Sequence, residues 1–110
     1  LAKQVQKVMF TFADIVERVE PRDAGVLLKA VEEPVMLTAL KMAEHNAPRV
    51  IDFFMINISK RLAQRLDGEL QTAADPKPRD GEAAQAEIVR QARELARAGE
   101  IKLVEQDEEE

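Results

Sequence analysis

The chain has 110 residues, no cysteine and a net charge of −5, a size at which a single domain can bury its own core. The absence of cysteine excludes disulfides, thiolate nucleophiles and cysteine-based zinc sites. Five of the 21 acids lie in the last six residues, and the 16 that remain balance 16 bases. Because nucleic-acid binding usually needs a basic excess, we expect no nucleic-acid partner. No apolar run is long enough for membrane insertion.

Helical patterns dominate, and no segment alternates with the two-residue period of a strand. Residues 1–9 are expected to be the end of a preceding linker helix, and residues 105–110 a disordered acidic tail. The helical domain itself is expected to span residues 10–104. Because the chain begins at Leu1, we expect it to be a piece of a longer protein.

Start and stop signals divide the domain into about six short helices. Thr11 is a candidate N-cap for a first helix that Pro21 ends, and Asp23 is a candidate N-cap for the second. Prolines that are tolerated in a first helical turn open two further helices, at Pro34 and Pro48. Helices this short are not stable alone, so their apolar faces must bury each other. The sequence therefore predicts an all-α, compact bundle.

The most informative helix follows Ser59, whose hydroxyl can accept a hydrogen bond from the first turn. An apolar residue recurs every four positions and forms one stripe: Ile58, Leu62, Leu66 and Leu70. Charged residues of both signs fall largely outside this stripe: Lys60, Arg61, Arg65, Asp67 and Glu69. The pattern predicts a helix that is anchored by aliphatic side chains and displays fixed charges to solvent.

A loop rich in proline and glycine is predicted over residues 72–81, before a last helix over residues 82–98 with Asp80 as its cap. Gly99 suits the left-handed residue that ends a helix. The apolar residues 101–104 are expected to pack back on the domain. Four phenylalanines are expected to be the bulky anchors of an otherwise aliphatic core: Phe10, Phe12, Phe53 and Phe54.

The chain offers little chemistry for catalysis. His45 is the only histidine, so paired-histidine metal patterns cannot form, and no Ser-His-Asp spacing stands out. Neighbouring acids such as Glu32 and Glu33 are more typical of a solvated face than of an acid/base pair. We therefore expect no catalytic, cofactor-binding or metal-binding residue and no enzyme activity. A carboxylate site near Asp52 or Glu44 is an alternative that no residue spacing supports.

Several short motifs occur in a characteristic order. Residues 9–16 read Met-Phe-Thr-Phe-Ala-Asp-Ile-Val, residues 39–41 read Ala-Leu-Lys, and residues 57–61 read Asn-Ile-Ser-Lys-Arg. The last helix closes with Ala-Gly-Glu-Ile at residues 98–101. Together these motifs resemble the C-terminal domain of the flagellar motor switch protein FliG, over roughly residues 5–104.

The resemblance implies an armadillo-like domain with right-handed superhelical packing, in the rotor ring (C-ring) of the flagellar basal body at the cytoplasmic face of the bacterial inner membrane. It implies that a charged helix faces the cytoplasmic loop of a MotA-like stator protein, for torque generation and switching of the rotation direction in motility and chemotaxis. The other implied partners are FliM-like and FliF-like rotor proteins, the latter through missing domains, and further copies of the same protein in a ring.

Matching residues to the family motifs gives the charges that the resemblance implies for the stator contact: Lys41, Arg61, Glu69 and Lys77, followed by Arg65 and Asp67. The resemblance also implies a hinge between two subdomains at four residues: Met9, Phe10, Thr11 and Phe12. Both phenylalanines fit equally well as core anchors at a turn between helices.

The sequence departs from the family pattern at two places. Gly68 stands where the family has the first of two consecutive acids, although Asp67 beside it could supply the charge. About three extra residues lie near residues 44–48. Two alternatives stay open: the charges form an ordinary solvated helix face, or the domain is an armadillo-like adaptor for an unrelated protein partner.

Overall fold

The computed structural model describes residues 10–104, so the predictions for residues 1–9 and 105–110 lie outside the described residues. As predicted, the described part is all-helical and contains six α-helices: α1 (Ile15–Arg18), α2 (Ala24–Ala30), α3 (Glu33–Asn46), α4 (Pro48–Ile56), α5 (Lys60–Thr72) and α6 (Pro78–Arg97). Two short 3₁₀ turns precede α1 and α2: Phe12–Asp14 and Pro21–Asp23. None of the described helices has the length and apolarity that crossing a membrane requires.

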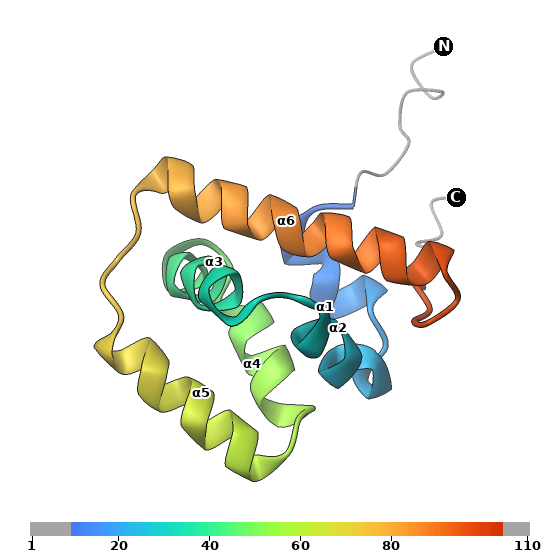
Figure 1. Cartoon of the computed structure of the whole chain (residues 1–110), viewed down its shortest axis with the longest axis horizontal. Helices are drawn as coiled ribbons and strands as arrows, with labels where there is room; N and C mark the ends of the chain where they lie inside the picture. The colour runs from blue at the N-terminus through green and yellow to red at the C-terminus, as the bar shows by residue number, and fades with distance from the viewer. Residues whose placement is uncertain (1–9, 105–110) are drawn as a thin grey trace.

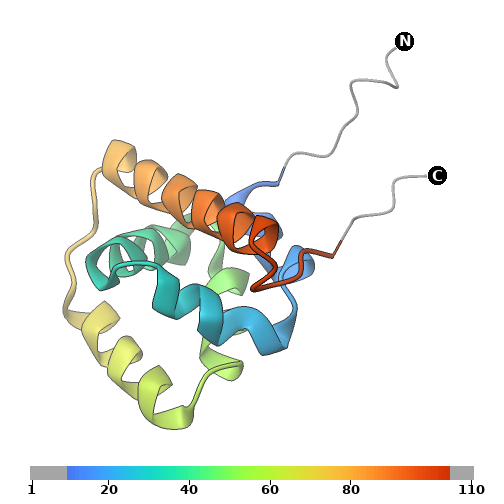
Figure 2. The ribbon, with the colours of Figure 1, turned by 45° about the vertical axis from the view of Figure 1, so that its right-hand side comes forward.

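Helix α3 lies at the centre of the domain. Figures 1 and 2 show α6 crossing one side of α3 and α5 lying on the opposite side, with α4 between α5 and the N-terminal helices. The buried residues of α3 form one stripe along the helix, and two of them are alanines: Met36, Ala39, Leu40 and Ala43. The small side chains allow neighbouring helices to approach closely, and α4, α5 and α6 all pack on α3.

The contact between α3 and α6 is closest at Gly81. A Cβ atom at this position would lie 2.5 Å from Sδ and 2.9 Å from Cβ of Met42. A glycine inside a helix costs about 1 kcal/mol relative to alanine, and Gly81 lies in the first turns of α6. The close approach of Met42 gives a packing reason for the glycine.

The predicted start of the last helix is wrong. Helix α6 begins at Pro78, with Lys77 as its N-cap, rather than at residue 82 behind an Asp80 cap. The fixed φ of proline suits the first helical position, where no N–H is needed. Asp80 therefore lies within the first turn, where its negative charge interacts favourably with the helix dipole.

The predicted capping role of Asp23 is also wrong. Asp23 lies at the N-cap of α2 but makes no side-chain bond to that helix. Its Oδ2 atom instead accepts a hydrogen bond of 3.0 Å from the backbone N–H of Lys102. In the same segment, Leu103 forms an isolated antiparallel bridge with Val19. The prediction that residues 101–104 pack back on the domain is confirmed.

Other local predictions are confirmed. All four phenylalanines are buried, and the rings of Phe53 and Phe54 meet edge to face with centroids 5.5 Å apart. Gly99 has a positive φ of 82°, and the N–H of Glu100 donates to the carbonyl of Leu95 at 2.8 Å. This is the geometry of a glycine-ended helix.

Gly81 and Gly68, both inside helices, are expected to respond oppositely to substitution. Gly81→Ala should lower the free energy of unfolding by about 1–3 kcal/mol, because the added methyl overpacks the contact with Met42. Gly68→Ala is the matched control, since nothing lies within 4 Å of an added Cβ there, and it should raise the free energy of unfolding by about 0.5–1 kcal/mol. Urea unfolding followed by circular dichroism measures both. A Gly81→Ala variant as stable as the unsubstituted chain would refute the close contact.

Candidate functional site

Helix α5 is anchored on one side and exposed on the other. Its N-terminus is capped as predicted, since the N–H of Leu62 donates to Oγ of Ser59 at 3.2 Å. Leu66 and Leu70 are buried, and the helix packs against α3 and α4. Figure 1 shows α5 at the edge of the domain farthest from α6. The apolar stripe therefore holds α5 in place while its outer side faces solvent.

The outer side of α5, opposite the buried leucines, includes Arg61. At about 100° per residue, Arg61, Gln64 and Gly68 share this direction, and all three are exposed. Among the described residues, Arg61 has no ion-pair partner. The guanidinium of Arg61 is thus presented to solvent on a helix that is fixed to the core.

Arg65 and Glu69 lie at the side of α5 nearest to α3. Nη2 of Arg65 lies 2.6 Å from Oε1 of Glu33, and its Nε lies 3.7 Å from Oε2 of Glu69. All three side chains are about half exposed, and such pairs are typically worth about 0–1 kcal/mol each. The charges of Arg65 and Glu69 are therefore paired, but weakly enough to exchange partners.

Lys41 is not on the exposed face that its predicted role would suggest. Its side chain is only 13% exposed, and its Nζ lies 3.3 Å from Oε1 of Glu44. Nζ also donates a hydrogen bond of 3.1 Å to the carbonyl of Leu70 in the last turns of α5. Unpaired carbonyls at a helix C-terminus carry partial negative charge and favour a cation. Lys41 thus fastens α3 to the end of α5.

Lys77 and Asp67 occupy separate places. Lys77 is exposed at the N-cap of α6, beyond the loop that follows α5. Oδ2 of Asp67 accepts a hydrogen bond of 2.9 Å from Nε2 of Gln71. Asp67 lies about 100° around the helix from Gly68, so it does not restore a negative charge on the outer side of α5.

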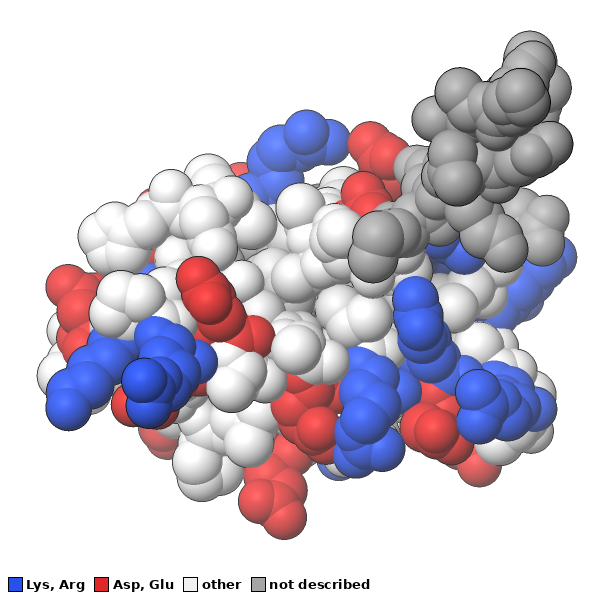
Figure 3. Space-filling model, turned by 90° about the horizontal axis from the view of Figure 1, so that it is seen from above, with Lys and Arg blue, Asp and Glu red and all other residues white. Residues whose placement is uncertain are grey.

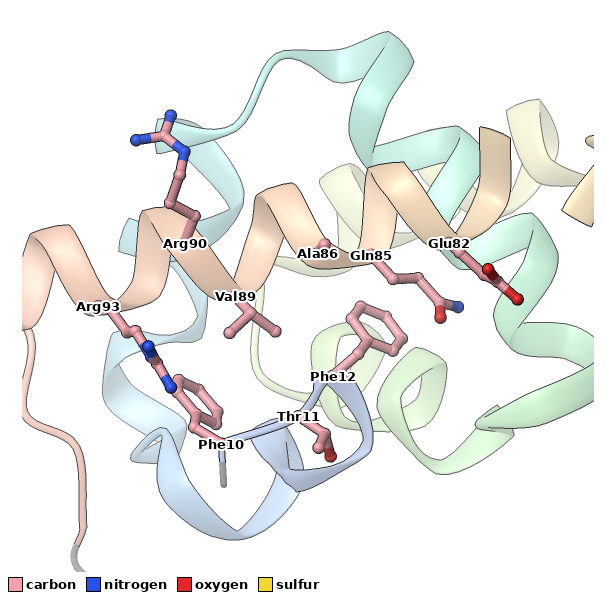
Figure 4. A pocket seen from close by; sticks show the side chains of 9 residues that line it. All are labelled: Phe10, Thr11, Phe12, Glu82, Gln85, Ala86, Val89, Arg90 and Arg93. Atoms are coloured by element: carbon pink, nitrogen blue, oxygen red, sulfur yellow. The ribbon is translucent and has the colours of Figure 1, made fainter. Parts of the chain in front are cut away.

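The predicted hinge residues are partly described. Met9 lies outside the described residues. Phe10 and Phe12 are each 7% exposed and line a groove of about 460 Å³ beneath α6. Figure 4 shows the guanidinium of Arg93 over the ring of Phe10, 6.0 Å from its centroid, while Phe12 points toward α6. Both phenylalanines are therefore core anchors, a role that is compatible with a hinge, and the hinge itself stays a prediction.

Thr11 lies between the two phenylalanines and is exposed. Its backbone N–H and its hydroxyl both donate to Oδ2 of Asp14, at 2.9 and 3.0 Å. The backbone here is held by local bonds as well as by the buried rings. Any hinge motion that involves Thr11 must preserve or replace these bonds.

One exposed apolar residue next to α5 was missed by the sequence reasoning. Ile56 ends α4 and is 77% exposed although it is a large apolar residue. It borders a shallow groove of about 500 Å³ that also reaches Lys60 and Asp67. The sequence places Ile56 at the end of a helix. That position could have indicated that its side chain is exposed.

Charges of both signs are mixed on the α6 side of the molecule. Figure 3 shows basic and acidic side chains interspersed around this face rather than gathered by sign. Arg90 donates to both carboxylate oxygens of Glu87, at 3.0 and 2.8 Å. Hydrogen bonds from Arg90 and then from Gln91 lower the pKa of Glu87 to about 2. Arg90 and Glu87 therefore pair with each other on α6.

The fold and the site define an all-helical domain that displays a charged helix on a rigid base. The sequence model of the FliG C-terminal domain matches residues 1–103. The flagellar motor switch protein FliG of Vibrio cholerae is 39% identical over 94% of this chain and 28% of its own length. That of Bacillus subtilis is 32% identical over 92% of this chain and 29% of its own length.

A solved structure shows the same fold. The crystal structure of FliG (residues 86–343) from H. pylori has a TM-score of 0.75 and 30% sequence identity, and it covers 92% of this chain and 46% of that one. The chain belongs to the FliG C-terminal domain family, which consists of motor switch components rather than enzymes. It spans less than a third of the length of the curated relatives it matches.

The position of Lys41 predicts a structural effect of its substitution. Lys41→Met should lower the free energy of unfolding by about 1.5–3 kcal/mol, because a hydrogen bond from a charged, largely buried donor is lost. The exposed Arg61 provides the control, and Arg61→Met should change stability by less than about 0.5 kcal/mol. Urea unfolding of both variants measures the difference. Equal stability of the two variants would show that Lys41 does not fasten α5.

Proposed function

We propose that this domain is part of a flagellar rotor, and that α5 is the surface on which a MotA-like stator protein acts to generate torque. Membership of the FliG family supports the rotor assignment. The observation that carries the proposal is the position of Arg61, exposed on the outer side of a helix whose other side is buried. The proposed location is the C-ring at the cytoplasmic face of the inner membrane.

The proposed contact works through weak, exchangeable charge interactions. A rotor–stator contact must form and release at each step, and exposed ion pairs worth about 0–1 kcal/mol meet this need. Opposite charges across the gap steer and align the partner more than they hold it. Arg61 and Lys77 are the proposed direct contacts, and Glu69 becomes available when its pair with Arg65 opens. Lys41 contributes mainly by holding α5 in place.

Switching of the rotation direction is proposed to use the segment from Met9 to Phe12. Helix α5 is fixed to α3. A change in the backbone conformation of this segment would therefore reorient the charged helix together with the rest of the domain. The buried rings of Phe10 and Phe12 limit such motion to changes that keep their contacts with α6 or replace them. FliM-like and FliF-like rotor proteins, and further copies of the protein in a ring, are the other proposed partners.

An armadillo-like adaptor for an unrelated protein is the second candidate. Two observations on α5 and its surroundings favour it. The uncharged Gly68 lies on the outer side of α5, and the apolar Ile56 is 77% exposed beside that helix. A partner that relies on apolar contact there would be less sensitive to the charge of Arg61.

Charge reversal on α5 tests the rotor proposal. The whole-length protein carrying Arg61→Glu should assemble flagella but swim poorly, because the substitution reverses a charge presented to the stator. Lys102→Glu is the matched control, since Lys102 is exposed and its segment packs near α1 rather than α5. Filament counts by microscopy and swimming speeds separate assembly from rotation.

Normal swimming and switching of the Arg61→Glu strain would refute the role of this residue. An equal loss with Lys102→Glu would also count against it, because the effect would then not be specific to α5. Circular dichroism of the isolated variants confirms that any loss does not arise from unfolding.

A further inference from the structure

Three side chains that can bind a metal ion meet beside the C-terminal end of α3. Glu44 and His45 lie in its last turn, and Asp75 lies in the loop between α5 and α6. Nε2 of His45 is 3.5 Å from Oδ1 of Asp75, and one ligand atom from each of the three residues lies within 4.8 Å of the others. In the described part of the chain, this is the one group of three His, Cys, Asp or Glu residues with such spacing.

The spacing of these atoms suits a small transition-metal ion. Zn²⁺ binds nitrogen and carboxylate oxygen at about 2.0–2.2 Å in tetrahedral geometry, which places neighbouring ligand atoms roughly 3.4 Å apart. The 3.5 Å between His45 and Asp75 already matches this distance. Glu44 is exposed, so a change of rotamer can bring its carboxylate to the same point.

The local electrostatics favour a cation. Two carboxylates gather at the negative end of the dipole of α3, a helix of 14 residues. One positive group opposes binding, because Nζ of Lys41 lies 3.3 Å from Oε1 of Glu44. That ammonium also donates to the carbonyl of Leu70, so part of its charge is directed to the end of α5. The balance between the two carboxylates and the one ammonium predicts that a divalent cation binds with moderate affinity.

The scaffold beneath the three ligands is held by hydrogen bonds of Gln85 that are partly or fully buried. Asn46, next to His45, exchanges two side-chain bonds of 3.2 and 3.1 Å with Gln85 of α6. Gln85 is 7% exposed and also donates to the carbonyl of Ala39 at 3.1 Å. The end of α3 is therefore fixed, and Asp75 is the one ligand that comes from a loop.

We propose that Glu44, His45 and Asp75 form a surface site for a divalent transition-metal ion such as Zn²⁺, with water as the fourth ligand. An imidazole with two carboxylates suits zinc and its neighbours better than Mg²⁺ or Ca²⁺, which prefer oxygen ligands alone. A bound ion would tie the loop after α5 to the end of α3. It would thereby restrain the loop that leads to Lys77. This site does not depend on the rotor function.

Zinc titration of the untagged whole chain tests the proposal. Calorimetry with zinc chloride at pH 7.5 should show saturable binding of one ion per chain. His45→Ala and Asp75→Asn should each weaken the affinity at least tenfold, and Asp67→Asn, an exposed acid outside the group, should leave it unchanged. Because His45 and Asp75 are 67% and 66% exposed, neither substitution should disturb the fold, which circular dichroism verifies.

The histidine provides an independent readout. His45 is the only histidine in the chain, so its ring signals in an NMR spectrum report directly on ligation, and zinc but not magnesium should shift them. The proposal is overturned if no saturable zinc binding occurs below about 1 mM, or if either His45→Ala or Asp75→Asn binds as tightly as the unsubstituted chain.

Discussion

The close contact of α3 with α6 is the constraint on which the rest of the domain depends. Because Gly81 has no side chain, the backbone of α6 lies directly against the side chain of Met42 of α3. Ala39 and Ala43 are both fully buried. Their small side chains add little volume to this face of α3. Because α4 and α5 also pack on α3, a shift of this helix would move α5, which carries Arg61.

Some charged residues support α5, and others face solvent on α5 or at the start of α6. Lys41 bonds to the end of the helix, and Arg65 reaches across to Glu33 of α3. Arg61 and Lys77 have no ion-pair partner among the described residues and face solvent. A force on Arg61 would therefore act on α5 and, through its packing, on α3 and α4.

Local signals in the sequence predicted the helices, while contacts between distant segments escaped prediction. Caps and prolines located Ser59 and Pro48, and the phenylalanines were correctly assigned to the core. The bond from Lys102 to Asp23 and the burial of Lys41 depend on how helices pack, which no local pattern encodes. The group of Glu44, His45 and Asp75 was missed for the same reason, because Asp75 belongs to a loop that only the fold brings near α3.

The rotor proposal requires that α5 acts on its partner through charge, and charge exchange tests this most directly. Rotation speed is measured in strains that combine Arg61→Glu with reversal, one at a time, of each acid in the cytoplasmic loop of the stator protein. We expect at least one combination to restore most of the rotation that Arg61→Glu removes, because an attractive pair replaces a repulsive one. Failure of every combination, together with a loss of the same size in Arg61→Ala, would show that the charge of α5 is not what the stator contacts.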